Sequence, residues 1–281
     1  MIIIADSGSS KTDWVVIPKS ERMEYLQCAG INPFFTNSED IQNLIKITFE
    51  NQHIKEKVKK IFFYGTGCIK NQNTDIIESG LRAYFKLAEI YVEDDMIGAA
   101  RSIFGNRQGI ACILGTGANS CKYDGTRIVE KIPALGYILG DEASGAFFGK
   151  LLINHYFKKI MPEDLSELFR IKYQPELGNI LNRVYKEPYP NRFLAKYTRF
   201  LSENIKHPYS INLLSVGFDA FLSNNVAKYI DYPYFQVGFV GSIAFHFSDI
   251  LISSCKKYNI SIGNILEKPI DGLIQYHTKN N

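Results

Sequence analysis

Residues 109–123 have the sequence Gly-Ile-Ala-Cys-Ile-Leu-Gly-Thr-Gly-Ala-Asn-Ser-Cys-Lys-Tyr, an apolar run that breaks at Gly115 and Gly117 and then resumes with an alternating pattern. This pattern predicts a strand, a tight turn and a second strand. Glycine permits positive φ and adds no side chain, so successive backbone N–H groups of the turn can point at one anion. We therefore predict that this hairpin turn holds a phosphate group.

The same pattern of strand, turn and strand occurs at the start of the chain. Residues 1–17, Met-Ile-Ile-Ile-Ala-Asp-Ser-Gly-Ser-Ser-Lys-Thr-Asp-Trp-Val-Val-Ile, form an apolar strand, a turn of small polar residues and another apolar strand. A chain of 281 residues exceeds the usual size of a single core. The repeated hairpin therefore indicates two domains, which we assign to residues 1–105 and 106–281.

The order of the expected elements defines the fold class. Apolar patterning predicts strands at 23–29, 60–67 and 89–92 and helices at 40–49, 75–86 and 97–104, with Asp40 as a helix cap. The order β-β-β-α-β-α-β-α is typical of an α/β domain with a mixed sheet. The second half repeats the hairpin and adds elements that we list here: a strand near 127–131, a mostly helical insertion at about 146–232, a strand at 234–240, and helices at 243–257 and 270–277.

Composition excludes several classes of partner. Lys and Arg (32) nearly balance Asp and Glu (29), and they are scattered along the chain, so we expect no nucleic acid. We find no apolar stretch of about 18 residues, so we expect no membrane span. Residues 1–17 contain Asp6, Lys11 and Asp13, which argues against a signal peptide. The five cysteines show no C-x-x-C spacing, and we expect a cytoplasmic protein.

Both glycine turns lead into strands, whereas the P-loop and the dinucleotide-binding turn lead into helices, and neither of those signatures occurs. The histidines show no metal-ligand spacing. Asp6 ends a strand beside the first turn, where its carboxylate can hold Mg²⁺ through water or cap the turn. Asp95 can accept a proton from an alcohol or cap the following helix, and we expect Asp94 to face solvent.

Five motifs together closely resemble the N-acetylglucosamine kinases, which are grouped with the activator-type (BadF/BadG-type) ATPases in the actin, hexokinase and Hsp70 fold superfamily. They occur in order between residue 2 and about residue 245. They are Asp6-x-Gly8-x-Ser10-Lys11-Thr12-Asp13, Asp95-x-x-Gly98-Ala99, Leu114-Gly115-Thr116-Gly117-Ala118-Asn119, Gly136-Tyr137-Ile138-Leu139-Gly140-Asp141-Glu142-Ala143-Ser144-Gly145 and Gly238-x-x-Gly241-Ser242.

The resemblance implies two ribonuclease H-like domains of the actin-like ATPase type that close on ATP and sugar in a cleft. It implies Asp95 as catalytic base and Asp6 as the residue that holds Mg²⁺. Glycines at the last motif would admit adenosine, although close helix–strand packing explains them nearly as well. The implied nucleotide-binding residues are Asp6, Gly8, Ser10, Lys11, Thr12, Gly115, Thr116, Gly117, Gly238, Gly241 and Ser242.

The resemblance also implies a sugar site. Two departures from the family pattern occur: the family usually has Gly-Gly-Gly-Thr where this chain has Ser7-Gly8-Ser9-Ser10, and relatives can have tryptophan where it has Tyr137. Gly136 and Gly140 would leave room for an N-acetyl group. The implied sugar-binding residues are Asn32, Asn119, Gly136, Tyr137, Gly140 and Asp141.

We therefore expect an ATP-dependent kinase that phosphorylates the 6-hydroxyl of N-acetylglucosamine or a related amino sugar, with Mg²⁺ on the nucleotide. Two alternatives stay open. One is an activator ATPase with an iron–sulfur cluster, although the cysteines form no obvious ligand pair. The other is a sugar-responsive ATP-binding protein without turnover. The sequence leaves the oligomeric state open, with a homodimer as one option, and gives no chemical role for residues 189–195.

Overall fold

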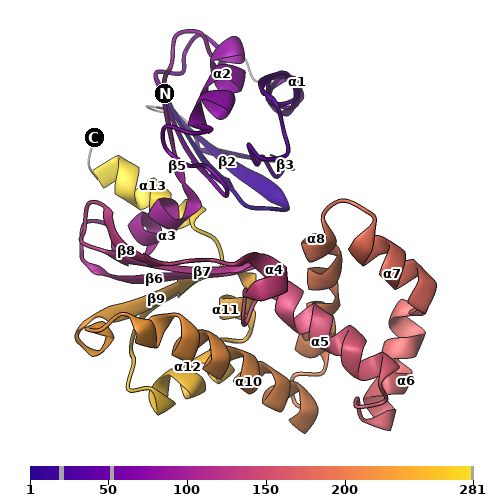
Figure 1. The fold of residues 1–281 in the computed structure, drawn as a ribbon. Coiled ribbons are helices and arrows are strands. Elements are labelled where there is room, and N and C mark those ends of the chain that lie inside the picture. Colours follow the sequence, from indigo (N-terminus) through magenta and orange to yellow (C-terminus); the bar gives the residue numbers. More distant parts are fainter. Residues whose placement is uncertain (19–21, 51–53, 280–281) are drawn as a thin grey trace. The chain divides into compact units, whose positions relative to one another are not determined.

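The computed structural model describes residues 1–18, 22–50 and 54–279, so His53 lies outside the described residues. By its internal contacts the chain divides into two compact units: Met1–Asn106 with Pro269–Asn281, here called the first unit, and Arg107–Lys268, the second unit. Each unit contains a mixed five-stranded sheet with flanking helices (Figure 1), which confirms the predicted α/β class. The domain ranges 1–105 and 106–281 stay a prediction.

The first unit follows the predicted element order. Its sheet has the strand order β3-β2-β1-β4-β5, in which β1, β4 and β5 are parallel and β2 and β3 are antiparallel to their neighbours. The elements are β1 (Ile2–Ser7), β2 (Lys11–Ile17), β3 (Glu24–Ala29), α1 (Ser38–Thr48), β4 (Lys60–Gly65), α2 (Thr74–Tyr84), β5 (Glu89–Asp94), α3 (Asp95–Phe104) and α13 (Ile270–Lys279).

The two faces of the first sheet are covered differently. Successive strand residues point to opposite faces, so Ala5, Trp14 and Phe63 share one face, and they form a core with α1 and α2. The other face is covered by α3 and α13 (Figure 1), which pack so closely that a Cβ on Gly272 would lie 2.2 Å from the carbonyl oxygen of Ser102.

A polar cluster joins α13 to this second face. Tyr64 Oη lies 2.8 Å from His277 Nε2 and accepts a hydrogen bond from Arg101 Nη1 at 2.9 Å. Arg101 also pairs with Glu93 at 3.0 Å. With a neutral imidazole, either Tyr64 Oη or His277 Nε2 is the donor of the bond between them, depending on the tautomer. Burial, and then the charge of Arg101, lower the pKa of His277 to about 4.

This shift predicts an acid-sensitive first unit. An unfolded histidine titrates near pH 6.5 but His277 in the fold titrates near 4. Between these values the unfolded state binds more protons, so the free energy of unfolding falls as the pH drops from 6.5 to 4, by up to roughly 3 kcal/mol. Urea unfolding at several pH values measures this slope. His277→Gln should flatten it, and equal slopes in both proteins would show that His277 is not the titrating group.

The second unit repeats the hairpin sheet and adds helices. Its strand order is β10-β9-β6-β7-β8. The strands are β6 (Gly109–Leu114), β7 (Ala118–Tyr123), β8 (Ile128–Ile132), β9 (Gln236–Val240) and β10 (Ser261–Leu266). The helices are α4 (Gly136–Leu139), α5 (Gly145–Phe157), α6 (Glu163–Tyr173), α7 (Leu177–Tyr185), α8 (Pro190–Ala195), η1 (Lys196–Thr198), α9 (Arg199–Glu203), α10 (Pro208–Asn224), η2 (Val226–Lys228), η3 (Tyr232–Tyr234), α11 (Ser242–His246) and α12 (Ser248–Lys257).

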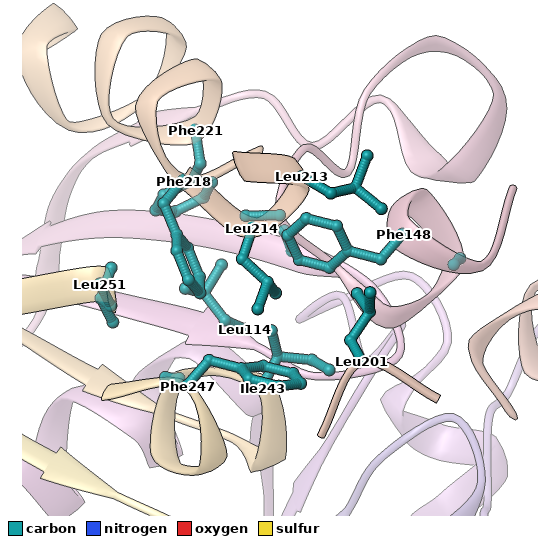
Figure 2. Close-up of a cluster of buried hydrophobic side chains, with 14 of the residues drawn as sticks. Leu114, Phe148, Leu201, Leu213, Leu214, Phe218, Phe221, Ile243, Phe247 and Leu251 are labelled. Carbon is teal, nitrogen blue, oxygen red and sulfur yellow. The ribbon is translucent and has the colours of Figure 1, made fainter. Parts of the chain in front are cut away.

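One apolar core joins the insertion helices to this sheet. Figure 2 shows Leu114 of β6 among Phe148 of α5, Leu214 and Phe218 of α10, and Ile243 of α11. All are buried in the fold. The core therefore fixes the start of α5 and the turn before α11 against the end of β6, where the second glycine turn begins.

Three local predictions were wrong. Asn37, not Asp40, caps α1, because the Asn37 side chain accepts from the N–H of Asp40 at 2.9 Å. Asp94 does not simply face solvent: it is the cap of α3. The sequence analysis also missed β10, whose apolar residues are interrupted by Gly263 and Asn264.

Within the described ranges, none of the helices has the length and apolar character needed to cross a bilayer.

Candidate active site

Three parallel strands of the first unit end in one row. The register pairs Ser7 at the end of β1 with Gly65 at the end of β4, and Gly65 with Asp94 at the end of β5. Neighbouring strands lie about 4.8 Å apart, so Asp94 is roughly 10 Å from Ser7. The N–H of Thr66 also donates to the Ser7 carbonyl at 2.9 Å. The first glycine turn and the helix start at Asp95 therefore lie at one edge of one sheet.

Two buried hydroxyl groups hold the first turn from inside. Ser7 Oγ and Thr12 Oγ1 lie 2.8 Å apart; Ser7 Oγ accepts from the N–H of Ile31 and Thr12 Oγ1 donates to the carbonyl of Ala29, each at 3.0 Å. Both side chains are fully buried. Thr12, which the resemblance implies as a nucleotide-binding residue, thus turns its hydroxyl into the fold and supports the turn instead of presenting an oxygen at its surface.

The backbone of the turn closes tightly. The N–H of Gly8 donates to the carbonyl of Lys11 at 3.0 Å, and the N–H of Gly30 donates to the carbonyl of Ser10 at 3.2 Å. A Cβ on Gly30 would lie 2.4 Å from the Gly8 carbonyl oxygen. Sequence reasoning missed Ser7 and Gly30 as supports of the turn, because Ser7 bonds to Ile31, which is 24 residues away, and Gly30 bonds to Ser10, which is 20 residues away.

The implied nucleotide-binding side chains lie around this turn. Ser10 and Lys11 are exposed at its outer side. Lys11 Nζ lies 3.0 Å from a carboxylate oxygen of Asp13, whose other oxygen accepts from Gln27 at 2.6 Å. Asp6 is half-buried and stands opposite Asp13 across the hairpin, so both carboxylates lie on the same sheet face. Lys11 offsets the charge of Asp13, and Asp6 is a half-buried acidic group next to the turn.

Asp94 and Asp95 divide the two roles that the sequence could not separate. The Asp94 carboxylate accepts from the N–H of Met96 at 2.7 Å and is the cap of α3. Asp95 occupies the first helical position and is half-buried. Its charge, with burial as the larger cause, helps to raise the pKa of the Cys68 thiol to about 12, so Cys68 lies close to it.

Asn32 lies at the same edge of the first sheet. A Cβ on Gly67, in the loop after β4, would lie 2.7 Å from Asn32 Oδ1 and 3.0 Å from the Phe34 ring. Asn32 Oδ1 accepts from the N–H of Phe34 at 2.9 Å, so the carboxamide is oriented by its own loop. The structure thus brings the implied sugar ligand Asn32 to the loop that carries Cys68, next to the implied base Asp95.

The second unit builds an equivalent turn. The N–H of Gly115 donates to the carbonyl of Gly117 at 3.0 Å, and the carbonyls of Gly115 and Thr116 accept from the N–H groups of Gly145 and Ala146 at 2.8 and 3.1 Å. These bonds fix the turn to the first residues of α5. Thr116 is half-buried at its tip.

Gly241 joins this turn, but Gly238 does not. Gly241 has φ +121°, and a Cβ there would lie 2.3 Å from the Leu114 carbonyl oxygen. Ser242 is exposed at the start of α11. Gly238 is buried within β9 and pairs with Ala111, roughly 10 Å along the strand from Gly241. The structure therefore brings Gly241 and Ser242 to the turn and leaves Gly238 buried inside the sheet.

Asp141 lies against the second turn. Its Oδ2 would be 2.9 Å from a Cβ on Gly117, and it accepts a hydrogen bond from the N–H of Ala118. Burial raises the pKa of Asp141, partly opposed by the Ala118 hydrogen bond. Asp141 and Ala143 both have left-handed backbones, with φ of 55° and 60°. Strain of this kind in non-glycine residues is typical of functional sites.

The remaining implied sugar-binding residues lie shortly before Asp141 or shortly after Gly117 in the chain. Gly136 has φ +73° with open space where a Cβ would be, and Gly140 packs on Leu135. Tyr137 is half-buried in α4, and its carbonyl accepts from Lys150 Nζ at 3.1 Å. Asn119, two residues after Gly117, is half-buried, and its side chain accepts from the N–H of Ser120 at 2.9 Å. The second unit thus places these residues within a few positions of its glycine turn.

Among the described residues, no group of three or more His, Cys, Asp or Glu side chains is arranged to hold a metal ion. Mg²⁺ on a nucleotide is usually bound by one or two carboxylates together with phosphate oxygens and water. The donor chemistry of Asp6, one carboxylate beside a glycine turn, fits that kind of binding.

Comparisons with known proteins agree with this arrangement. No protein-family model and no curated protein matches the sequence. A solved structure of a proposed N-acetylglucosamine kinase from Porphyromonas gingivalis matches with 39% identity and a TM-score of 0.94, covering 100% of this chain and 99% of that one. A proposed N-acetylglucosamine kinase from Chromobacterium violaceum matches at 14% identity and TM-score 0.77, covering 98% of each chain. A glucokinase of the ROK family from Streptomyces griseus, solved with glucose and AMPPNP, matches at 14% identity and TM-score 0.57, covering 98% of this chain and 97% of its own.

Two mixed sheets, each with a glycine turn after its first strand, define a sugar kinase of the actin-like ATPase fold, as predicted. Identity of 39% over the whole chain then identifies the family. The chain belongs to the N-acetylglucosamine kinase family of the Porphyromonas gingivalis protein.

Proposed function

We propose that the protein transfers the γ-phosphoryl group of ATP to the 6-hydroxyl of N-acetylglucosamine or a related amino sugar. The observation that carries the proposal is the row from Ser7 through Gly65 to Asp94, which aligns a glycine turn and the carboxylate of Asp95 at one edge of the first sheet. Family membership supports the same activity. Because the reaction uses ATP, we propose a cytoplasmic enzyme.

Asp95 is the proposed catalytic base. Its carboxylate accepts the proton of the sugar hydroxyl as that oxygen attacks the γ-phosphorus and the bond to the β-phosphate oxygen breaks, with ADP as leaving group. The side chain of Asp94 caps α3, whose first residue is Asp95. Asn32, in contact with the loop after β4, is proposed to orient the sugar.

The glycine turns supply the proposed phosphate contacts. Gly8, Gly115 and Gly117 keep side chains away from the phosphates. Since the N–H groups of Gly8 and Gly115 are bonded within their own turns, the proposed donors are other N–H groups of the two turns. Mg²⁺ held by Asp6 through water would neutralise charge on the phosphates. In the second unit, the proposed sugar ligands are Asn119, Tyr137, Asp141 and the glycines at 136 and 140.

The activator-ATPase alternative is not favoured. An iron–sulfur cluster needs thiolate ligands. Cys68, Cys112, Cys121 and Cys255 are buried, and burial raises the pKa of Cys68 and Cys255 to about 12 and that of Cys112 well above its ordinary value. The thiols of Cys68, Cys112 and Cys255 therefore stay protonated at neutral pH.

A coupled ADP-release assay tests the proposal. We expect sugar-dependent ADP release with N-acetylglucosamine or another amino sugar in a panel of N-acetylglucosamine, glucosamine, N-acetylmannosamine, N-acetylmuramic acid and glucose, and a phosphorylated sugar by mass spectrometry. ADP release that is independent of every sugar would indicate a bare ATPase. Binding of sugar and ATP without ADP release would indicate the binding-protein alternative.

Asp141→Asn should selectively weaken the binding of the sugar. The amide has the same shape and still accepts from the N–H of Ala118, but it lacks the charge that can bind sugar hydroxyls strongly. We expect the sugar KM to rise about tenfold or more, with little change in the KM for ATP. Glu142→Gln is the matched control, since Glu142 accepts from Asn224 at 3.0 Å instead of contacting the turn. An unchanged sugar KM in Asp141→Asn would remove Asp141 from the sugar site.

A further inference from the structure

An ion pair spans the strand–helix corner that carries Asp95. Strand β5 ends at Asp94 and α3 begins at Asp95, with no residue between the two elements. Arg101 Nη1 donates to Glu93 Oε1 at 3.0 Å, so the pair joins the residue before this corner to the second turn of α3. The two partners are eight positions apart in the chain, and the whole corner lies between them.

Tyr64 of β4 holds the same guanidinium. The Nη1 group of Arg101 carries two N–H donors, and it also donates to Tyr64 Oη at 2.9 Å. The carbon Cζ of Arg101 lies 5.7 Å from the centre of the Tyr64 ring. Burial raises the pKa of Tyr64, so its hydroxyl keeps its proton at neutral pH. Tyr64 stands beside Glu93 in the register of β4 and β5, which brings the three side chains together.

The last helix of the chain completes these contacts. Figure 1 shows α13 beside α3. From α13, the Tyr276 ring centre lies 5.2 Å from Arg101 Cζ, and His277 Nε2 lies 2.8 Å from Tyr64 Oη. His277 also stacks on Phe62 of β4, with ring centres 3.8 Å apart. Arg101 thus contacts two aromatic rings and two oxygen atoms, which together fix the plane of its guanidinium.

The first turn of α3 rests directly on Tyr64. A Cβ on Gly98 would lie 2.9 Å from both Cβ and Cγ of Tyr64, closer than such atoms come in proteins. Gly98 follows Asp95 by nearly one helical turn. The start of α3 therefore meets the Tyr64 ring if it moves toward β4, and the pair of Arg101 with Glu93 opposes movement away from the end of β5.

We propose that Arg101, held by Tyr64, is a positioning residue for Asp95. The inference rests on the proposed function, in which Asp95 accepts the proton of the sugar hydroxyl, and adds the group that keeps this carboxylate in place. Arg101 acts through Glu93 and the start of α3, without contacting sugar or nucleotide. Misplacing a reacting group by about 1 Å can cost about 10²-fold in rate, so loosening this corner lowers turnover more than substrate binding.

Steady-state kinetics of Tyr64→Phe and of two Arg101 variants test the proposal at a temperature where each protein is folded. Tyr64→Phe removes the hydroxyl that bonds to Arg101 and His277 but keeps the ring against Gly98. We expect kcat to fall about tenfold or more, with the KM values for ATP and for the preferred sugar of the panel within about twofold. Arg101→Met should lower kcat further, and Arg101→Lys should recover part of that loss, because lysine keeps a charged donor for Glu93.

Tyr84→Phe is the matched control, because it deletes a tyrosine hydroxyl on the other face of the same sheet. Tyr84 Oη donates to the Phe49 carbonyl at 3.2 Å, beside the core that α1 and α2 form. We expect its kcat to stay within about twofold of wild type. An equal fall of kcat in Tyr84→Phe and Tyr64→Phe, at equal melting temperatures, would show a general loss of stability and overturn the positioning role. Wild-type kcat in both Tyr64→Phe and Arg101→Met would overturn it as well.

Hydrogen–deuterium exchange of the unliganded proteins tests the corner without turnover. Tyr64→Phe should speed exchange in a peptide that covers residues 94–99 by about tenfold or more, and leave a peptide that covers the first glycine turn, residues 7–12, as in wild type. Unchanged exchange at residues 94–99 would show that Arg101 does not hold this corner. Absence of sugar-dependent ADP release by wild type would instead reject the proposed function, while the exchange data would still decide whether these contacts fix the position of Asp95.

Discussion

Asp95→Asn is expected to lower the turnover number by about 10²–10⁴ while the KM for ATP changes little. The amide has the shape of the carboxylate but cannot accept the proton of the sugar hydroxyl. The protein should remain folded, because the cap of α3 is Asp94 and not Asp95. Loss of one charge in the first turn of a helix costs about 0.3–1 kcal/mol. Steady-state kinetics with thermal unfolding of the same sample would separate the two effects.

Asp94→Asn is the matched control for this prediction. Asparagine is as good a helix cap as aspartate, so the free energy of unfolding should be nearly unchanged. The turnover number should stay within a few fold of wild type. If instead Asp94→Asn lost turnover and Asp95→Asn kept it, the base would be one residue earlier in the chain. Near-normal turnover in both variants would remove this helix start from the catalytic step.

Gly30→Ala is expected to displace the backbone of the first glycine turn, although residue 30 is not part of that turn. The new Cβ would lie 2.4 Å from the Gly8 carbonyl oxygen and 2.9 Å from two backbone atoms of Ser9, so the turn must move. Overpacking of this kind costs about 1–3 kcal/mol of the free energy of unfolding. Because Gly8 belongs to the turn that is proposed to contact the phosphates, we expect ATP affinity to fall about tenfold or more, corresponding to about 1.4 kcal/mol.

Gly178→Ala provides the same substitution without the clash. Gly178 is exposed in α7, where a Cβ would meet only the side chain of Glu176 at 3.8 Å. Alanine in a helix is favoured over glycine by about 1 kcal/mol, so stability should be unchanged or slightly higher and ATP affinity unchanged. Calorimetric titration of ATP into both variants tests the pair. Wild-type ATP affinity in a folded Gly30→Ala protein would show that the first turn does not bind the nucleotide.

Much of the fold was predictable because its signals are local. The two hairpins follow from apolar runs that are interrupted by small residues, and the strand pattern stops at the glycines and resumes after them. The element order of the first unit and the helical insertion were also confirmed. The resemblance to N-acetylglucosamine kinases, carried by five motifs, agrees with the 39% identity to the Porphyromonas gingivalis protein.

The candidate site was predicted less completely. Asp94 and Asp95 are adjacent acidic residues with the same local pattern, and only the hydrogen bond to Met96 assigns the cap to Asp94. Thr12 stands in a motif that includes exposed residues, yet its hydroxyl is buried against Ala29.

By itself the sequence determined where the glycine turns are, which acidic residues stand beside them, and the family to which the chain belongs. Those features depend on neighbouring residues, whose spacing alone sets the periodicity and the freedom of the backbone. Tertiary structure alone decided that Gly30 supports the first turn, that Gly241 contacts the second, and that α13 packs on the first unit through His277. These contacts join residues far apart in sequence, and close packing between them depends on the shape of both surfaces at once.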